Sequence, residues 1–126
     1  MDGKMLDRYS FGRRGEEEAA RHFEGLGFRI EERGYRCKIG EIDLICTRGK
    51  LLVFAEVKAR RSLAYGMPQE AVNARKIRQI RRTAAWYLTQ GMRIKRLYAD
   101  FDMRFDIVEV RMTGGSYEIN HIENAF

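Results

Sequence analysis

The stretch GEIDLICTRGKLLVFAEVK, residues 40–58, decides the fold of this chain. Two runs rich in Ile, Leu, Val and Phe, residues 40–46 and 51–58, predict two β-strands, and residues 47–50 between them predict the turn of a hairpin. Because side chains alternate along a strand, Glu56 and Lys58 share one face, and the hairpin can bring Asp43 to the same face. Buried charges are costly unless they are paired or bind a metal, so this trio indicates a functional site.

The rest of the chain predicts helices around a sheet. We expect a first helix over residues 11–25, with Ser10 as its N-cap. After it we expect either one helix from Pro68 to about residue 90, or a short helix at Pro68 followed by a second that starts near Asn73. The first helix has an apolar face of Ala19, Ala20, Phe23 and Leu26. Further strands are predicted at residues 28–36, 105–110 and 117–122, with residues 91–103 irregular. The order αβββαββ predicts one α/β domain, residues 1–126, with a mixed central sheet flanked by helices.

Composition restricts the class of protein. The 126 residues suffice for one domain with a buried core. Lys and Arg number 24 against 18 Asp and Glu, a net charge of +6, which favours an anionic partner such as nucleic acid. No signal peptide and no membrane-spanning run is present in the sequence, so we expect a cytoplasmic protein without a membrane partner. Cys37 and Cys46 are too few for a disulfide framework or a zinc site and are expected to be small buried thiols in strands.

The carboxylates predict a metal site. Asp43 and Glu56 are hard oxygen ligands that suit Mg²⁺ or Mn²⁺ better than zinc, and the carbonyl of Val57 could add a third oxygen. Glu16 precedes Ala19 and Phe23 by three and seven residues, so it lies on the inward face of its helix and could reach the same site. Lys58 would orient a water, take its proton or neutralise charge on a transition state. Beside two carboxylates it is expected to stay charged, which favours the electrostatic role.

Basic residues predict a nucleic-acid contact. The second helix carries the run Arg75, Lys76, Arg78, Arg81 and Arg82, and Arg60 and Arg61 precede it. Such a run is either a solvated helix face or a track of phosphate contacts, and the sequence leaves both readings open. Gln69, near the helix start, either touches phosphate or metal-bound water or is a plain surface residue. The nucleic-acid-binding candidates are therefore Arg60, Arg61, Gln69, Arg75, Lys76 and Arg78.

Other polar and aromatic residues have simpler interpretations. Asp106, on the predicted fourth strand, is expected to pair with an arginine or to cap a backbone group. His22 and His121 lack ligand spacing, and neither is a catalytic candidate. Trp86 and Tyr87 are expected to be core or dimer contacts rather than base-stacking residues. The sequence shows no helix-turn-helix, zinc-finger or RNA-recognition signature.

Several motifs together carry a resemblance to a known family. They are Gly12–Glu16, Gly40–Ile45, Phe54–Arg60, Gly66–Val72, Lys76, Arg104–Val108 and His121–Phe126. With them the chain resembles the YraN family of uncharacterised bacterial proteins, in the PD-(D/E)xK nuclease superfamily, and is similar to archaeal Holliday-junction resolvases, which are dimers. Ile42 stands where the superfamily signature has Pro.

The resemblance implies a restriction-endonuclease-like fold with a metal site of Glu16, Asp43, Glu56 and Lys58. It further implies Mg²⁺-dependent hydrolysis of DNA phosphodiesters, including at branched DNA, by a homodimer. Two other functions stay open. One is a non-catalytic nucleic-acid-binding module with a nuclease-like fold, and the other is an interaction protein for a DNA repair or replication partner.

Overall fold

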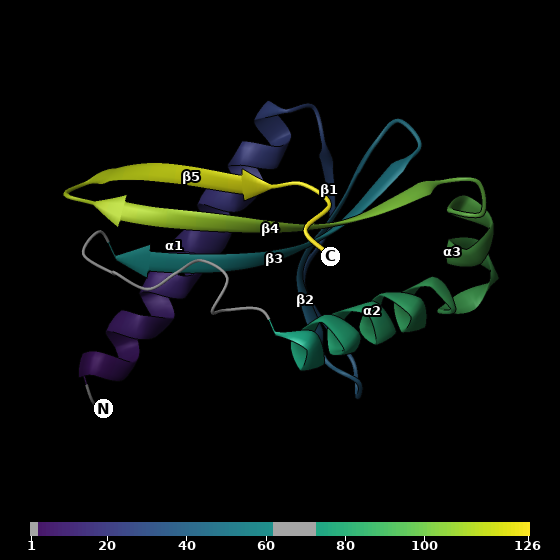
Figure 1. Cartoon of the computed structure of the whole chain (residues 1–126), viewed down its shortest axis with the longest axis horizontal. Coiled ribbons are helices and arrows are strands. Elements are labelled where there is room, and N and C mark those ends of the chain that lie inside the picture. Colours follow the sequence, from purple (N-terminus) through teal and green to yellow (C-terminus); the bar gives the residue numbers. More distant parts are fainter. Residues whose placement is uncertain (1–2, 62–72) are drawn as a thin grey trace.

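A computed structural model of the chain, which describes the backbone of residues 3–61 and 73–126, has one five-stranded sheet flanked by helices (Figure 1). Side chains are described for residues 11–61, 73–90 and 93–126. The elements are α1 Gly3–Gly25, β1 Arg29–Arg36, β2 Glu41–Arg48, β3 Leu51–Arg61, α2 Ala74–Leu88, α3 Gly91–Leu97, β4 Asp102–Thr113 and β5 Ser116–Ile122. The predicted mixed α/β fold and its order are confirmed, with α3 as an addition.

The sheet is mixed because one connection crosses over. Its strand order is β1-β2-β3-β4-β5, with β1–β2, β2–β3 and β4–β5 antiparallel. β3 and β4 are parallel, so the chain between them must return along the sheet, and α2 and α3 lie in this connection. Of the helices that the structure describes, none is both long and apolar enough to cross a membrane.

Helices cover both faces of the sheet. On β3, Val53 and Ala55 belong to the core that α1 closes with Ala19, Ala20 and Phe23. Leu52 and Phe54, the alternate residues, belong to the core that α2 closes with Ile80, Ala84 and Tyr87. β3 is thus apolar on both faces, as expected of a central strand, and Tyr87 is the core residue that the sequence predicts.

Three local predictions are wrong. α1 begins at Gly3, so Ser10 lies within the helix and is not its N-cap. Leu26 follows the end of α1 and is 42% exposed, so it is not on the apolar face. Residues 91–103 are not irregular, because α3 and the start of β4 lie there. A seven-residue helix has too few turns to show a periodic pattern in the sequence.

The start of the second helix is resolved in favour of one alternative. Asn73 is the N-cap of α2, and its side chain accepts a hydrogen bond of 2.9 Å from the backbone N–H of Lys76. The alternative start at Pro68 lies outside the described residues. Cys46 is a buried thiol as predicted, whereas Cys37 is half-buried and follows the end of β1.

Candidate active site

The candidate site lies where β2 and β3 part. Their pairing runs from Arg48 and Leu51 to Leu44 and Ala55 and ends there, whereas β2 goes on pairing with β1 as far as Glu41. Asp43 and Glu56 are the next residues on the two separating strands. The Oδ2 of Asp43 accepts a hydrogen bond of 2.8 Å from the backbone N–H of Val57. The Asp43 carboxylate thus takes the place of the backbone hydrogen bond that the separating strands no longer form, and it links β2 to β3.

Glu56 is held between two lysines. Its carboxylate is buried, and its Oε1 lies 3.3 Å from the Nζ of Lys58 and 3.7 Å from the Nζ of Lys76. Lys58 is two residues further along β3, so the predicted shared face of Glu56 and Lys58 is confirmed. Lys76 reaches the same oxygen from the first turn of α2. The lysine side chains are 28% and 33% exposed, so water screens these ion pairs only in part.

Glu16 lies on α1, and its charge acts on Asp43 and Glu56. Next to it, Gly15 packs so closely on β3 that a Cβ there would lie 2.7 Å from the Cβ of Ala59. This contact needs glycine, and it places α1 directly against the strand that bears Glu56. Burial raises the pKa of Glu16, and the negative charges of Glu41 and Glu56 raise it further. The predicted inward orientation of Glu16 agrees with these interactions.

The carboxylates of the site repel one another. Burial, and then the charge of Glu56, raises the pKa of Asp43 to about 7, although the hydrogen bond from Val57 acts in the opposite direction. Glu16 adds to this repulsion. A carboxyl group that titrates near neutral pH in a partly buried position is typical of a functional site. A bound cation would relieve the repulsion and hold these carboxylates in the charged form.

The donor set matches a hard divalent cation in its chemistry. Glu16, Asp43, Glu56 and the Val57 carbonyl offer only oxygen, the ligand atom that Mg²⁺ and Mn²⁺ prefer. Within the part of the chain that the structure describes, however, no three His, Cys, Asp or Glu side chains already lie close enough to hold a metal. Glu56 faces its two lysines instead. Binding an ion would therefore compete with the ion pairs of Lys58 and Lys76 for this carboxylate.

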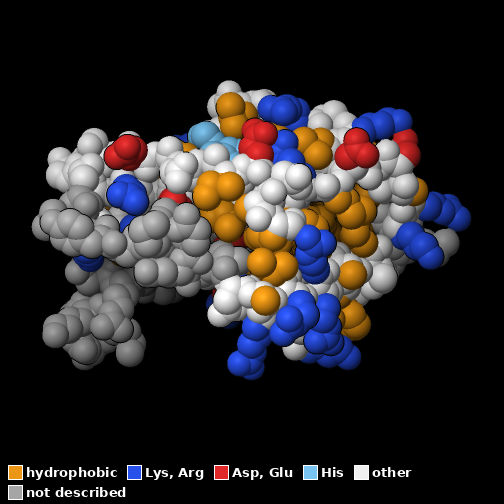
Figure 2. Space-filling view, viewed as in Figure 1, with side chains coloured by type: hydrophobic (Ala, Val, Ile, Leu, Met, Phe, Trp, Pro, Cys, Tyr) orange, Lys and Arg blue, Asp and Glu red, His pale blue; other side chains and the backbone are white. Residues whose placement is uncertain are grey.

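A basic groove leads to these carboxylates. A cavity of about 670 Å³ lies along α2 and is lined by Ile39, Asn73, Arg75, Lys76, Arg78, Gln79 and Arg82. A second cavity, of about 380 Å³, shares Lys76 and Gln79 with the first and extends to Arg36 and Glu41. Figure 2 shows Lys and Arg side chains gathered over α2. Lys76 therefore links the groove to Glu56, and we call these two cavities the α2 groove.

The turn between β1 and β2 forms the opposite wall of the α2 groove. The Nε2 of Gln79 donates a hydrogen bond of 3.1 Å to the carbonyl of Ile39, and the Nζ of Lys38 lies 4.9 Å from the ring centre of Trp86. Gly40 is packed against α2, since a Cβ there would come within 2.9 Å of the Oγ1 of Thr83. The sequence gives no sign of Arg36, Gln79 or this turn in the site, because only the crossover of the chain brings α2 over the hairpin.

The predicted nucleic-acid-binding residues separate into three groups. Arg75 and Arg78 are exposed on α2 and line the α2 groove, and Lys76 extends from the groove to Glu56. Arg60 is turned toward Glu109, with 3.4 Å between the Nε of Arg60 and the Oε2 of Glu109. The guanidinium of Arg61 lies 4.6 Å from the ring centre of Phe11, on the side of α1. Gln69 lies outside the described residues.

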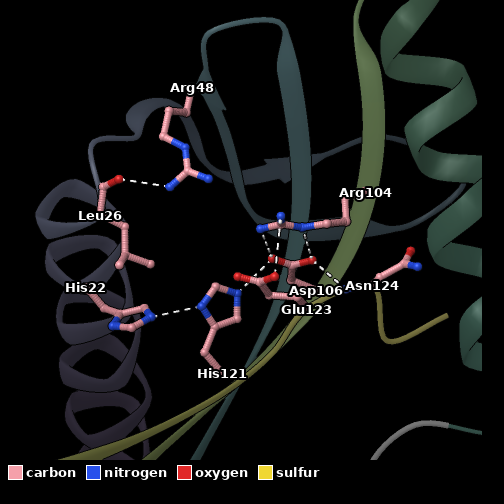
Figure 3. A network of polar contacts seen from close by, with 8 residues as sticks. All are labelled: His22, Leu26, Arg48, Arg104, Asp106, His121, Glu123 and Asn124. Atoms are coloured by element: carbon pink, nitrogen blue, oxygen red, sulfur yellow. Dashed lines mark hydrogen bonds and ion pairs between the residues drawn. The ribbon is translucent and has the colours of Figure 1, made fainter.

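A second polar network joins α1 to β4 and β5 (Figure 3). The Nε2 of His22 and the Nδ1 of His121 are 2.9 Å apart, and the Nε2 of His121 lies 2.7 Å from the Oδ2 of Asp106. Arg104 donates two hydrogen bonds of 2.9 Å to the Asp106 carboxylate, and the backbone N–H of Asn124 donates one of 3.0 Å. The expected pairing of Asp106 with an arginine and a backbone group is confirmed.

This network ties the first helix and the end of the chain to β4. Burial alone would raise the pKa of Asp106, but the hydrogen bonds from His121, Arg104 and Asn124 lower it below its usual value. The carboxylate is therefore fully occupied by donors, and we do not count it among the candidate metal ligands. The contact between His22 and His121 has no signal in the sequence, because 99 positions separate the two residues.

Fold and site together define a class of protein. A mixed five-stranded sheet flanked by helices, with an aspartate on β2 and a Glu-x-Lys on β3, is the arrangement of a restriction-endonuclease-like α/β protein. Comparison with known proteins gives the family. The model of the uncharacterised protein family UPF0102 matches residues 15–110, and the chain belongs to this family, which is also called YraN.

Relatives match over nearly the whole chain. A UPF0102 protein of Syntrophotalea carbinolica is 43% identical over 119 residues, which cover 94% of this chain and 93% of the relative. A UPF0102 protein of Desulforamulus reducens is 42% identical over 123 residues, covering 95% and 98%. A third, of Geobacter sulfurreducens, is 44% identical over 117 residues, covering 91% and 87%. These names state no activity, so the function is argued from the site.

Proposed function

We propose that the protein is a metal-dependent endonuclease that hydrolyses phosphodiester bonds in DNA, at branched or otherwise structured sites. The observation that supports this most strongly is the meeting of Asp43, Glu56 and Lys58 where β2 and β3 part, at the end of the α2 groove. Glu16, Asp43, Glu56 and the Val57 carbonyl would hold Mg²⁺ or Mn²⁺. By resemblance to the archaeal resolvases we also propose that the protein acts as a homodimer.

The proposed roles follow from the charges. A bound metal ion supplies polarisation of the phosphodiester and a water of lowered pKa. Lys58, paired with Glu56 at 3.3 Å, is positioned as a cation, which supports charge neutralisation rather than proton abstraction. Lys76 also forms an ion pair with Glu56. When a metal ion binds Glu56, Lys76 can leave this carboxylate and bind a phosphate oxygen instead.

The α2 groove supports recognition of phosphates rather than of base sequence. Its walls carry Arg75, Lys76, Arg78 and Arg82, all of which are cationic and suited to the sugar–phosphate backbone. Such contacts fix the position of nucleic acid and make binding strongly dependent on salt. Phosphate contacts without base contacts support selection by the shape of the DNA, as at a junction or a flap.

One observation favours a second function, a nucleic-acid-binding module without catalysis. Among the described residues, no set of three potential ligands is close enough to hold a metal, and both lysines already neutralise Glu56. In such a module the lysines and carboxylates would be a structural ion-pair cluster beside the same basic groove.

Cleavage assays separate the two functions. Labelled four-way junction, flap, single-stranded and duplex DNA would be incubated with the protein and Mg²⁺ or Mn²⁺. Asp43→Asn and Lys58→Ala are expected to abolish cleavage while binding persists. Asp102→Asn is the matched control, since Asp102 is exposed where β4 begins, beside Leu51 at the other end of β3, and it should retain activity. Binding without cleavage by the wild type on every substrate would establish the binding module instead.

A further inference from the structure

A buried carboxylate on the same face of the sheet has no place in the proposed metal site. Glu109 of β4 is the register neighbour of Lys58 in the parallel pair, so its side chain leaves the sheet on the face that bears Glu56 and Lys58. It is 0% exposed. On β5, Asn120 is the direct partner of Glu109. Lys58, Glu109 and Asn120 thus form one polar row across three strands.

Glu109 has one satisfied and one unsatisfied oxygen. Its Oε1 accepts a hydrogen bond of 2.8 Å from the Nδ2 of Asn120, which fixes the carboxylate. Its Oε2 lies 3.4 Å from the Nε of Arg60. Among the described residues, these two atoms are the buried side-chain atoms without a hydrogen bond. The two atoms are buried and belong to oppositely charged side chains, so Arg60 and Glu109 form an ion pair without a well-aligned hydrogen bond.

The position of Arg60 gives this pair a consequence for function. Arg60 follows Lys58 by two residues on β3, about 7 Å along the strand and on the same face. Its side chain is 20% exposed, so the group that Glu109 anchors still meets solvent next to Lys58. A guanidinium fixed by a buried carboxylate on one side loses less conformational freedom when it binds an anion on the other.

We propose that Glu109, itself fixed by Asn120, is a positioning residue that orients Arg60 to bind a backbone phosphate beside the one attacked at Lys58. This role rests on the proposed function, because it requires nucleic acid at the site. It also accounts for a negative charge on a face that binds a polyanion. A bare carboxylate there would repel the ligand, whereas one that orients an arginine improves binding.

The direction in which Glu109→Gln changes the affinity for DNA tests the positioning role of Glu109. Glu109→Gln keeps the size of the side chain and removes a negative charge, so general electrostatics alone predicts tighter binding of DNA. Positioning predicts the opposite, a loss of about tenfold in affinity and a shallower dependence of affinity on salt, both matching Arg60→Gln. The double variant Arg60→Gln/Glu109→Gln should then bind no worse than Arg60→Gln. Glu118→Gln, an exposed carboxylate on β5, is the control for loss of charge and should bind as the wild type or slightly tighter.

Affinities would be measured by fluorescence anisotropy with labelled junction DNA at several salt concentrations, on proteins whose circular dichroism matches the wild type. Asn120→Ala serves as a second variant if Glu109→Gln fails to fold, and a smaller loss in the same direction is expected. Unchanged or tighter binding by whichever of the two variants folds would overturn the role of Glu109 and leave the proposed function intact. If the wild type itself bound none of the DNA structures, the proposed function would fail, and this role with it.

Discussion

Replacing Asp43 by Asn should make the metal-free protein more stable at neutral and higher pH. In the folded protein the pKa of Asp43 is about 7 against an ordinary 3.8, so the folded state prefers the protonated carboxyl group. The charge on Asp43 therefore destabilises the fold increasingly as pH rises from 3.8 to about 7, and by a constant amount above that. Below about pH 3, the folded and unfolded states are both protonated, and the effect disappears.

The magnitude follows from the same shift. About three pKa units at 1.36 kcal/mol each set an upper limit of about 4 kcal/mol. The asparagine oxygen can still accept the hydrogen bond of Val57, but its amide N–H₂ needs a new acceptor, which removes part of the gain. We therefore expect Asp43→Asn to be about 1–3 kcal/mol more stable than the wild type near pH 8, with this advantage lost below about pH 3.

Urea denaturation in EDTA, followed by the fluorescence of the single tryptophan, Trp86, measures this difference. Mg²⁺ at about ten times its dissociation constant should stabilise the wild type by about 1.4 kcal/mol and leave Asp43→Asn unchanged. Asp102→Asn, at an exposed position where β4 begins, is the control and should show neither effect. If Asp43→Asn were less stable than the wild type near pH 8 without metal, the charge of Asp43 would not destabilise the fold. Asp43 would then be a structural hydrogen-bond acceptor and not a carboxylate that repels its neighbours until a metal binds.

Four further substitutions test the packing and the second polar network by the same denaturation assay. Gly15→Ala should destabilise the fold by about 1–3 kcal/mol, because its Cβ would meet Ala59. Gly12→Ala is the comparison: a Cβ there has open space around it, so this variant should be more stable than the wild type by about 0.5–1 kcal/mol. Equal effects of the two substitutions would contradict the close approach of α1 to β3. Asp106→Asn should destabilise by about 3 kcal/mol, because it weakens the ion pair between half-buried Arg104 and this buried side chain, and a change within 0.5 kcal/mol would show that the network is dispensable. Burial and the neighbouring His121 lower the pKa of His22 below 6.5, so wild-type stability should fall as pH drops through that value, and His22→Gln should flatten this part of the profile; a profile that His22→Gln leaves unchanged would assign the effect to other groups.

The sequence predicts the fold well where patterns are long. Alternation and apolar content identify all five strands, since β3 is buried on both faces and follows β2 in a hairpin with a short turn. It fails where a signal is short or non-local. The early start of α1 and the existence of α3 depend on weak local preferences that tertiary contacts decide.

The site shows the same division. Glu56 and Lys58 follow from strand alternation, and Glu16 follows from the helical spacing of its apolar neighbours. Other features depend on how the strands are ordered and connected. They are the separation of β2 from β3, the contact of Lys76 with Glu56, and the pairing of Lys58 with Glu109. One sequence read by local patterns cannot supply these, because register and crossover are properties of the whole sheet.

The proposed nuclease function requires that Asp43 and Glu56 hold a divalent metal ion. Crystals soaked in Mn²⁺ and measured at the manganese absorption edge test it directly, since the anomalous signal marks the ion without reference to activity. We expect a peak between the Asp43 and Glu56 carboxylates, about 2.1 Å from an oxygen of each, with Lys58 and Lys76 turned away from Glu56. A peak elsewhere, or none at Mn²⁺ concentrations that support cleavage, would contradict it.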